Sequence, residues 1–219
     1  MPLRQRPLLL GHRGARAVEA IPENTLPSFD LALQHGCDGF EFDVRLARDG
    51  FPVICHDAEV AGTKIAEAQR EALRLPGLEE VLARYSARAF LDIELKVPGL
   101  DGRWLTALQA TPPRRGWVAS SFLPEALKRL RACASGVPLG IICDQKKELA
   151  RWRHLPVEYV IPHHTLVSRQ LIHEVHAAGK QLFAWTVNDE RDMVRLAEWG
   201  VDGIISDETE RLCRMLGPG

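Results

Sequence analysis

The chain has 219 residues, of which 46% are hydrophobic and 26% are charged, and its formal net charge is −1. These values are those of an ordinary soluble globular protein with room for one large domain or two small ones. Because the charges form neither a basic stripe nor an acidic tail, the sequence argues against a nucleic-acid-binding or membrane-surface protein.

The first half of the chain alternates short apolar runs with amphipathic stretches. Asn24 and Thr25 are residue types that cap the start of a helix. The apolar run 51–55 follows a strand after too few residues for a parallel crossover, so it should return antiparallel, and Asp49-Gly50 is a hairpin turn signal. We predict strands at 8–14, 39–44 and 89–96 and helices at 25–36 and 77–85.

The second half continues the alternation. The predicted strands are 116–122, 138–143, 157–164, 181–187 and 202–207, and the predicted helices are 104–109, 124–135, 146–155, 168–179, 190–200 and 208–216. Eight strand-then-helix units in one chain are the pattern of a closed (β/α)8 TIM barrel. We therefore predict an α/β fold in which residues 1–219 form a single barrel domain, with an antiparallel hairpin arm after strand 2. An open doubly wound sheet is less favoured, because no GxGxxG turn follows the first strand.

In such a barrel, the functional residues lie at the carboxyl ends of the strands. The sequence places many polar and aromatic side chains at these positions. They are His12, Arg13, Glu41, Asp43, Glu94, Lys96, Ser120, Ser121, Phe122, His163, His164, Trp185, Asn188 and Asp207.

Two pairs in this set have the spacing that puts both side chains on one face of a strand. Glu41 and Asp43 form the first pair, and Glu94 and Lys96 form the second. If both pairs face the barrel mouth, three carboxylates meet one ammonium group, and the like charges need further compensation. An all-oxygen ligand set favours a single hard divalent cation, Mg²⁺ or Ca²⁺.

The hairpin arm offers a reason for the position of His56. If Asp49-Gly50 forms a two-residue turn, Asp43 lies directly opposite His56, and the imidazole is held against the carboxylates. A shift of one residue in the register would turn His56 to the other face.

Other reactive side chains fit structural roles better. His163 and His164 are expected at the rim of the barrel, and Ser120 and Ser121 lack the GxSxG elbow of a serine hydrolase. The cysteines contain no CxxC pair, and we expect them to be reduced and buried. They are Cys37, Cys55, Cys133, Cys143 and Cys213.

The motifs resemble those of the glycerophosphodiester phosphodiesterases, in order along nearly the whole chain. The specific part is HR at 12–13, ExD at 41–43 and HD at 56–57. The family fold is a (β/α)8 barrel, which agrees with the strand count. Supporting stretches are GHRG (11–14), PENT (22–25), RDG (48–50), GLEEVL (77–82), DIELK (92–96), SSF (120–122), AWTVND (184–189) and GVDGIISD (200–207).

The resemblance implies a role for each candidate residue and a reaction. The reaction is the metal-dependent hydrolysis of glycerophosphodiesters, small-molecule substrates, to sn-glycerol 3-phosphate and an alcohol. The implied general acid–base pair is His12 and His56, the ligands of one divalent cation are Glu41, Asp43 and Glu94, the phosphate-binding residues are Arg13 and Lys96, and the pocket walls are Phe122 and Trp185.

The chain departs from the family pattern in two places. Ala47 stands where the family usually has threonine in a TxDG turn, and the segment after HD, residues 58–69, is short. The insertion that covers the site in many members is therefore largely missing. Because that segment shapes the pocket, the resemblance does not decide which diester is the preferred substrate.

Two alternatives stay open, while a third, a metal-dependent aldolase or enolase-type barrel, has only Lys96 in its favour. One is a lysophospholipase D-type phosphodiesterase acting on lipid diesters, which an exposed apolar rim would favour. The other is a non-catalytic barrel that binds phosphorylated ligands. The presence of both His12 and His56 argues against it, because binding alone needs no acid–base pair.

The expected location is the cytoplasm. The run Leu8–Leu10 is too short for the core of a signal peptide, and no apolar run approaches the ~18 residues of a membrane span. We expect no integral membrane segment and no nucleic-acid partner. A homo-oligomer is compatible with the sequence, but nothing indicates one.

Overall fold

A computed structural model describes residues 6–99 and 102–218, and eight parallel strands within them close into a barrel. The first strand pairs with both its neighbour in sequence and the last strand, which closes the ring. The predicted single-domain (β/α)8 barrel is confirmed. Its strands are β1 (Leu8–His12), β2 (Gly39–Leu46), β6 (Phe90–Leu95), β7 (Trp117–Ser121), β8 (Leu139–Cys143), β9 (Tyr159–Pro162), β10 (Gln181–Ala184) and β11 (Gly203–Ser206).

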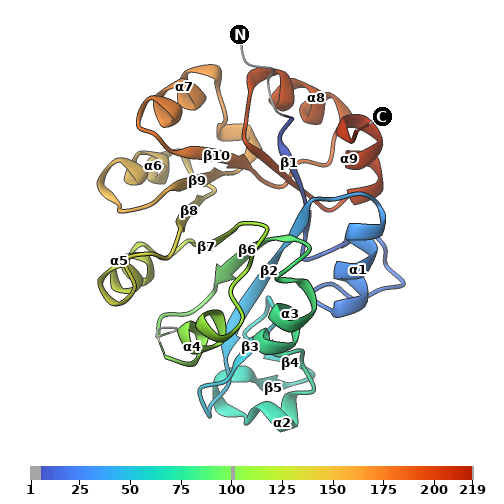
Figure 1. Ribbon diagram of the computed structural model, residues 1–219, viewed down its shortest axis with the longest axis vertical. Helices are drawn as coiled ribbons and strands as arrows, with labels where there is room; N and C mark the ends of the chain where they lie inside the picture. Colours follow the sequence, from blue (N-terminus) through green and yellow to red (C-terminus); the bar gives the residue numbers. More distant parts are fainter. Residues whose placement is uncertain (1–5, 100–101, 219) are drawn as a thin grey trace.

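The helices lie outside the ring of strands (Figure 1). They are α1 (Leu26–Gln34), α3 (Leu78–Tyr85), α4 (Arg103–Ala110), α5 (Pro124–Cys133), α6 (Lys146–Leu149), α7 (Arg169–Ala177), α8 (Glu190–Trp199) and α9 (Thr209–Leu216). A short 3₁₀ helix, η3 (His164–Leu166), follows β9. Across the described residues, no helix is both long and apolar enough to cross a membrane.

The predicted helix 146–155 differs from expectation. It is a single α-helical turn, α6, continued by a 3₁₀ helix, η2 (Ala150–His154). The apolar residues Leu149, Trp152 and Leu155 recur every three positions, which matches the three residues per turn of a 3₁₀ helix. Leu149 ends α6, Trp152 lies within η2 and Leu155 directly follows it, and all three pack against the core.

The hairpin arm is antiparallel as predicted, but the predicted register is wrong by one residue. The return strand is β3 (Pro52–Ile54), and Asp43 lies opposite Cys55, the residue after it, and not opposite His56. The Cys55 amide donates to the Asp43 carbonyl at 3.0 Å. The turn has three residues and ends at Gly50, which has a φ of 76°. Three-residue turns ending in a left-handed glycine are a common alternative to two-residue turns, and an Asp-Gly pair fits both.

Strand β2 carries its aromatic residues on the outer face of the barrel. The ring of Phe29 in α1 stacks on Phe40 with 4.2 Å between centroids, and Tyr85 at the end of α3 meets Phe40 edge-on at 5.0 Å. Phe42 packs beside them and is fully buried. Because successive strand residues alternate faces, this outer cluster turns the acidic residues of β2 into the barrel.

Apolar side chains fill the barrel interior below the carboxyl ends of the strands. Together they form a dry floor, so polar groups directly above it lie in a medium of low dielectric constant. This apolar floor consists of Leu10, Phe90, Val118, Ile142, Ile161, Phe183 and Ile205.

The segment after the hairpin forms a small projection beside β3 (Figure 1). Ile65 and Leu73 anchor it by packing against Ala47 and Val53. It does not cover the barrel mouth, because none of the described residues 58–75 lines the cavity there. Its elements are β4 (Glu59–Val60), β5 (Thr63–Lys64), η1 (Ile65–Glu67) and α2 (Arg70–Leu73).

Phe29→Ala tests the outer aromatic cluster. We expect the free energy of unfolding to fall by about 3–5 kcal/mol, because a fully buried ring between Phe40 and Tyr85 is lost. Denaturant unfolding measures this. Met215→Ala, at a residue that is 37% exposed, is the matched control and should change it by less than about 0.5 kcal/mol. An equal fall in the free energy of unfolding for the two substitutions would contradict the stabilising role of the aromatic cluster.

Candidate active site

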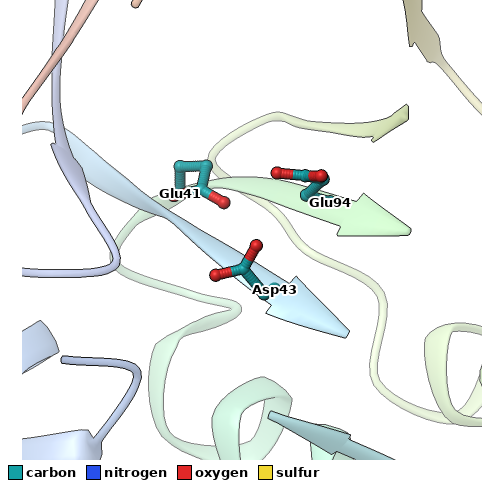
Figure 2. A group of neighbouring side chains, drawn as sticks. All are labelled: Glu41, Asp43 and Glu94. Atoms are coloured by element: carbon teal, nitrogen blue, oxygen red, sulfur yellow. The ribbon is translucent and has the colours of Figure 1, made fainter. Parts of the chain in front are cut away.

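Three carboxylates from two neighbouring strands meet at the carboxyl end of the barrel. Glu41 and Asp43 both point inward from β2, and Glu94 lies beside Asp43 on β6. One carboxylate oxygen from each residue lies within 4.8 Å of the other two. Figure 2 shows the three side chains converging over the two strands. The structure thus brings together the residues that the sequence suggested as metal ligands.

Burial makes this cluster electrostatically demanding. Exposed fractions are 4% for Glu41, 0% for Asp43 and 7% for Glu94. Burial, reinforced by the charge of Asp43, raises the pKa of Glu94 to about 7 and that of Glu41 well above its usual value. Burial also opposes ionisation of Asp43, but Lys96 and Arg13 outweigh it and lower the Asp43 pKa. Asp43 therefore stays ionised, whereas Glu41 and Glu94 ionise readily only with a further positive partner.

Two cations and one amide surround Asp43. Lys96 Nζ lies 2.7 Å from Glu94 Oε1 and 3.3 Å from Asp43 Oδ1, and Arg13 Nε lies 3.2 Å from Asp43 Oδ2. Asn24 Nδ2 donates to Asp43 Oδ2 at 2.7 Å. Because the amide adds no charge, two cations face three carboxylates, and the cluster keeps a formal negative charge.

Two buried oxygens of the cluster accept no hydrogen bond from the described residues. They are Glu41 Oε1 and Asp43 Oδ1, the second of which has Lys96 nearby only as an ion pair. A buried acceptor left without a donor typically costs about 1–3 kcal/mol. Orphaned, negatively charged oxygen donors suit a hard divalent cation. Glu41, Asp43 and Glu94 therefore fit an ion such as Mg²⁺ or Ca²⁺.

His12 ends β1 next to the carboxylates and is 7% exposed. Its Nδ1 lies 2.7 Å from Asp207 Oδ1. Since a carboxylate can only accept, Nδ1 carries a hydrogen. The other ring nitrogen, Nε2, lies 3.9 Å from Glu41 Oε2. His12 therefore presents its Nε2 to the site.

His56 reaches the same cavity although the hairpin register differs from the prediction. Strand β3 ends at Ile54, so strand alternation no longer decides where His56 points. The Arg45 guanidinium donates to the His56 carbonyl from two nitrogens, at 2.8 and 2.6 Å. His56 Nδ1 lies 2.8 Å from Oδ1 of the exposed Asp57. The expected consequence of a register shift, a histidine turned away, is therefore wrong.

A tight bend after β1 directs Arg13 into the site. Arg13 has a φ of 53° and Gly14 a φ of 85°, both left-handed. A Cβ at Gly14 would lie 2.4 Å from Ser28 Oγ, so only glycine fits. Arg13 Nη1 then donates to Glu23 Oε1 at 2.8 Å, which holds the guanidinium near Asp43.

These residues surround a cavity of about 130 Å³ at the barrel mouth. Phe122 and Trp185 meet edge to face, 5.4 Å apart, and the Trp185 indole donates to the Ile161 carbonyl at 3.0 Å. All the predicted site residues except Asp43 line the cavity. The lining is His12, Arg13, Glu41, His56, Asp92, Glu94, Lys96, Phe122, Ile142, Ile161, Trp185 and Ile205.

A larger groove, of about 900 Å³, lies near the amino end of β11 and is lined by residues such as Trp199 and Asp202. It does not contain Glu41, Asp43 and Glu94, which are the one cluster of potential metal ligands found among the described residues. The smaller cavity at the barrel mouth is therefore the candidate active site.

The serines and histidines set aside from the sequence are engaged elsewhere. Ser120 Oγ donates to Asp92 Oδ1 at 2.5 Å, and Ser121 Oγ donates to the Leu95 carbonyl at 2.7 Å. His163 packs edge-on against Trp185 at 5.5 Å and does not line the cavity. None of these has the arrangement of a serine nucleophile with an adjacent base.

The cysteines match the expectation only in part. Cys37 and Cys143 are buried, but Cys133 is exposed. Cys133 ends α5 beyond Leu130, the last residue of that helix that packs on the barrel. The prediction that the thiols are buried is therefore wrong for Cys133 and holds only in part for Cys55 and Cys213, which are half-buried.

Sequence reasoning missed several residues around the site. Asn24 and Thr25 were both expected as helix caps; Thr25, which accepts from the Ser28 amide, is confirmed as the cap, while Asn24 instead binds Asp43. Asp92 lies two residues before Glu94 on the same inward face, and burial raises its pKa to about 7. The spacing of Asp92, Glu94 and Lys96, each two residues apart, could have predicted that Asp92 shares their inward face.

The family model of the glycerophosphoryl diester phosphodiesterase family matches residues 12–72 and 103–211, more than half of the chain. The chain is 28% identical over 242 residues to a glycerophosphodiester phosphodiesterase of Caldanaerobacter subterraneus, covering 97% of this chain and 98% of that protein. It is 26% identical over 248 residues to a glycerophosphodiester phosphodiesterase of Bacillus subtilis, covering 92% and 84%.

Solved structures show the same architecture. The phosphodiesterase of Oleispira antarctica, solved in complex with the product sn-glycerol-3-phosphate, superposes with a TM-score of 0.83 at 26% identity, covering 96% of each chain. The glycerophosphodiester phosphodiesterase of Thermotoga maritima superposes with a TM-score of 0.80 at 25% identity, covering 97% of this chain and 100% of that one.

The raised carboxyl pKa values predict that stabilisation by a divalent ion depends on pH. Glu94 has a pKa of about 7 when folded, against about 4.3 when unfolded. Between these values the folded state holds the extra proton, so without an ion the stability falls as pH rises and levels off above about 7. An ion must displace that proton below pH 7 but not above it.

We therefore expect a fixed Mg²⁺ or Ca²⁺ concentration to raise Tm more at about pH 8 than at about pH 6. Thermal unfolding at matched ionic strength measures this. Glu94→Gln is the control and should weaken both the shift and its pH dependence, since it removes the titrating ligand. An identical Tm shift at both pH values in the unsubstituted protein would contradict the prediction.

Proposed function

The chain belongs to the glycerophosphoryl diester phosphodiesterase family, and we propose that it hydrolyses glycerophosphodiesters to sn-glycerol 3-phosphate and an alcohol by two-histidine general acid–base catalysis. The observation that carries the proposal is the joint placement of His12 and His56 on one small cavity with the carboxylate cluster. A protein that only bound a phosphate would not need two imidazoles there.

His12 and His56 would share the proton transfers of the reaction. One imidazole removes the proton from the attacking hydroxyl, which belongs to water or to the glycerol of the substrate, and the other protonates the departing alkoxide. Support comes from their hydrogen bonds. Each ring is bound at Nδ1 by a carboxylate, His12 by Asp207 and His56 by Asp57, which leaves each Nε2 for proton transfer.

Arg13 and Lys96 would bind the phosphate. Both line the cavity, and both already compensate the charge of Asp43. Arginine can donate to two phosphate oxygens at once, whereas lysine acts as a point charge. Glu41, Asp43 and Glu94 would hold one divalent cation, Mg²⁺ or Ca²⁺, which when bound supplies positive charge for the phosphate oxygens.

The organic part of the substrate would lie against Phe122 and Trp185. The relative from Oleispira antarctica was solved with sn-glycerol-3-phosphate, which supports the same product here. The lipid-diester alternative would need an apolar rim, but of the large hydrophobic residues exposed on the described surface only Leu123, which follows Phe122, is next to a cavity-lining residue, and Met215 lies in α9. We therefore favour water-soluble glycerophosphodiesters.

The wider biological assignment follows from this reaction. We propose that residues 1–219 act as one barrel domain in the cytoplasm, in lipid and glycerol metabolism, with the small-molecule diester as its partner. Product analysis with glycerophosphodiesters and lysophospholipids tests the substrate class directly. Release of sn-glycerol 3-phosphate from the soluble diesters supports the proposal, and turnover of lysophospholipids alone contradicts it.

His12→Ala and His56→Ala should each lower kcat by about 10²–10⁴-fold, because each removes one partner in proton transfer. Steady-state kinetics measures kcat, and circular dichroism checks that the fold survives. His173→Ala, at an exposed residue of α7, is the matched control and should leave kcat unchanged. Near-wild-type turnover by a folded His12 or His56 variant would remove that histidine from the mechanism.

Chelation should silence the enzyme if the carboxylates hold an essential ion. We expect excess EDTA to abolish turnover and added Mg²⁺ or Ca²⁺ to restore it, since the ion would supply positive charge that stabilises the phosphate oxygens during the reaction. The measurement is initial rate against metal concentration after dialysis. Full activity in excess EDTA would rule out metal dependence.

A further inference from the structure

We propose that Asn188 and Asp207 form a positioning pair that fixes the ring proton of His12 on Nδ1 and keeps Nε2 free for the reaction. The inference rests on the proposed function, because it explains how His12 is held ready for proton transfer. Neither residue lines the cavity, so they act through His12 and not on the substrate.

The amide of Asn188 has one allowed orientation. Ser206 Oγ accepts from the Glu208 amide at 3.0 Å, so its hydroxyl hydrogen is directed to Asn188 Oδ1, also at 3.0 Å. The Asp207 amide donates to the same Asn188 oxygen at 3.0 Å. With two donors on its oxygen, Asn188 must turn its NH₂ group the other way, toward the carboxylate of Asp207.

Each oxygen of Asp207 is consequently occupied by a different donor. Asn188 Nδ2 donates to Oδ2 at 2.7 Å, whereas Oδ1 lies 2.7 Å from His12 Nδ1 and also accepts from Arg16 Nη1 at 3.2 Å. Burial would raise the pKa of Asp207, but the hydrogen bonds from His12 and Asn188 and the nearby Arg16 lower it below its usual range. The ionised carboxylate therefore accepts on both sides, and His12 Nδ1 must donate.

This arrangement serves His12 in either role. As a base, neutral His12 needs a bare Nε2, which requires the proton on Nδ1. As an acid, the imidazolium needs an acceptor at Nδ1 while Nε2 gives up its proton. Both requirements are met by a carboxylate that cannot rotate away, because Asn188 holds its other oxygen.

Asp207→Asn separates this idea from a loss of packing, since the two side chains have nearly the same shape. The new amide would meet a fixed donor, Asn188 Nδ2, on one side and His12 on the other. It should turn its oxygen to Asn188 and its NH₂ group to His12, while the half-exposed Arg16 moves aside. His12 must then accept at Nδ1 and carry its proton on Nε2, where it is useless as a base.

The swapped double variant, Asn188→Asp with Asp207→Asn, reverses that outcome. The new carboxylate at position 188 would accept from Ser206 and the backbone on one oxygen and from the new amide at position 207 on the other. The amide oxygen at position 207 then faces His12 and accepts from Nδ1. The proton of His12 returns to its original nitrogen although the carboxylate now stands at the other position of the pair.

The test combines kinetics with nitrogen NMR of the His12 ring, assigned by its loss in His12→Ala. We expect Asp207→Asn to lower kcat by about 10²–10⁴-fold with little change in KM, as for other misplaced imidazole protons. The kcat of the double variant should be at least about tenfold higher than that of Asp207→Asn. At alkaline pH, the spectra should show the His12 proton on Nδ1 in the wild type and on Nε2 in Asp207→Asn. In the double variant they should show it on Nδ1 again.

Asp202→Asn is the matched control. It makes the same change beside another paired histidine, His176, whose Nε2 lies 2.8 Å from Asp202 Oδ2 near the amino end of β11. We expect it to leave kcat unchanged. Wild-type kcat in Asp207→Asn, or an inactive double variant with the Nδ1–H form restored, would overturn the inference. A wild-type protein inactive on every diester would refute the proposed function instead, and the NMR spectra would still test the pair.

Discussion

Three carboxylates in a nearly dry pocket cannot all ionise without compensating charge, and this constraint shapes the rest of the site. The apolar floor below them offers neither a charge nor a hydrogen-bond donor as compensation. Lys96 and Arg13 supply part of what is missing, and Asn24 adds a hydrogen bond where no charge is needed. The remaining deficit explains why oxygens of Glu41 and Asp43 lack donors, and why an added cation suits this place.

The loop between β1 and α1 connects the charges of the site into one network. Glu23 accepts from Arg13 and Arg16, and Arg16 in turn reaches Asp207, the partner of His12. The bend at Gly14, which only glycine can form, brings this loop over the barrel mouth. A single loop therefore orients both Arg13, the proposed phosphate-binding group, and the surroundings of His12, so changes in the loop should affect binding and proton transfer together.

Sequence periodicity was enough to predict the barrel and the convergence of Glu41, Asp43 and Glu94, because alternation fixes the face of each side chain and a barrel brings the carboxyl ends of its strands to one mouth. The hairpin register could not be predicted, since Asp-Gly fits turns of two or three residues. The role of Asn24 was also hidden. A polar residue before a helix looks like a cap, and only the folded chain shows its side chain bound to Asp43. Long-range partners of this kind leave no local pattern.

The two histidines differ in how the fold supports them, and this difference bears on how the site works. His12 ends a barrel strand, and its partner Asp207 follows another, so both are set by the sheet. His56 lies beyond the end of β3 and is held by Arg45 through its backbone and by an exposed Asp57. Loops open more easily than barrel strands. The fold thus holds His12, one half of the proposed acid–base pair, within the barrel wall and places His56, the other half, on a loop that can open more easily.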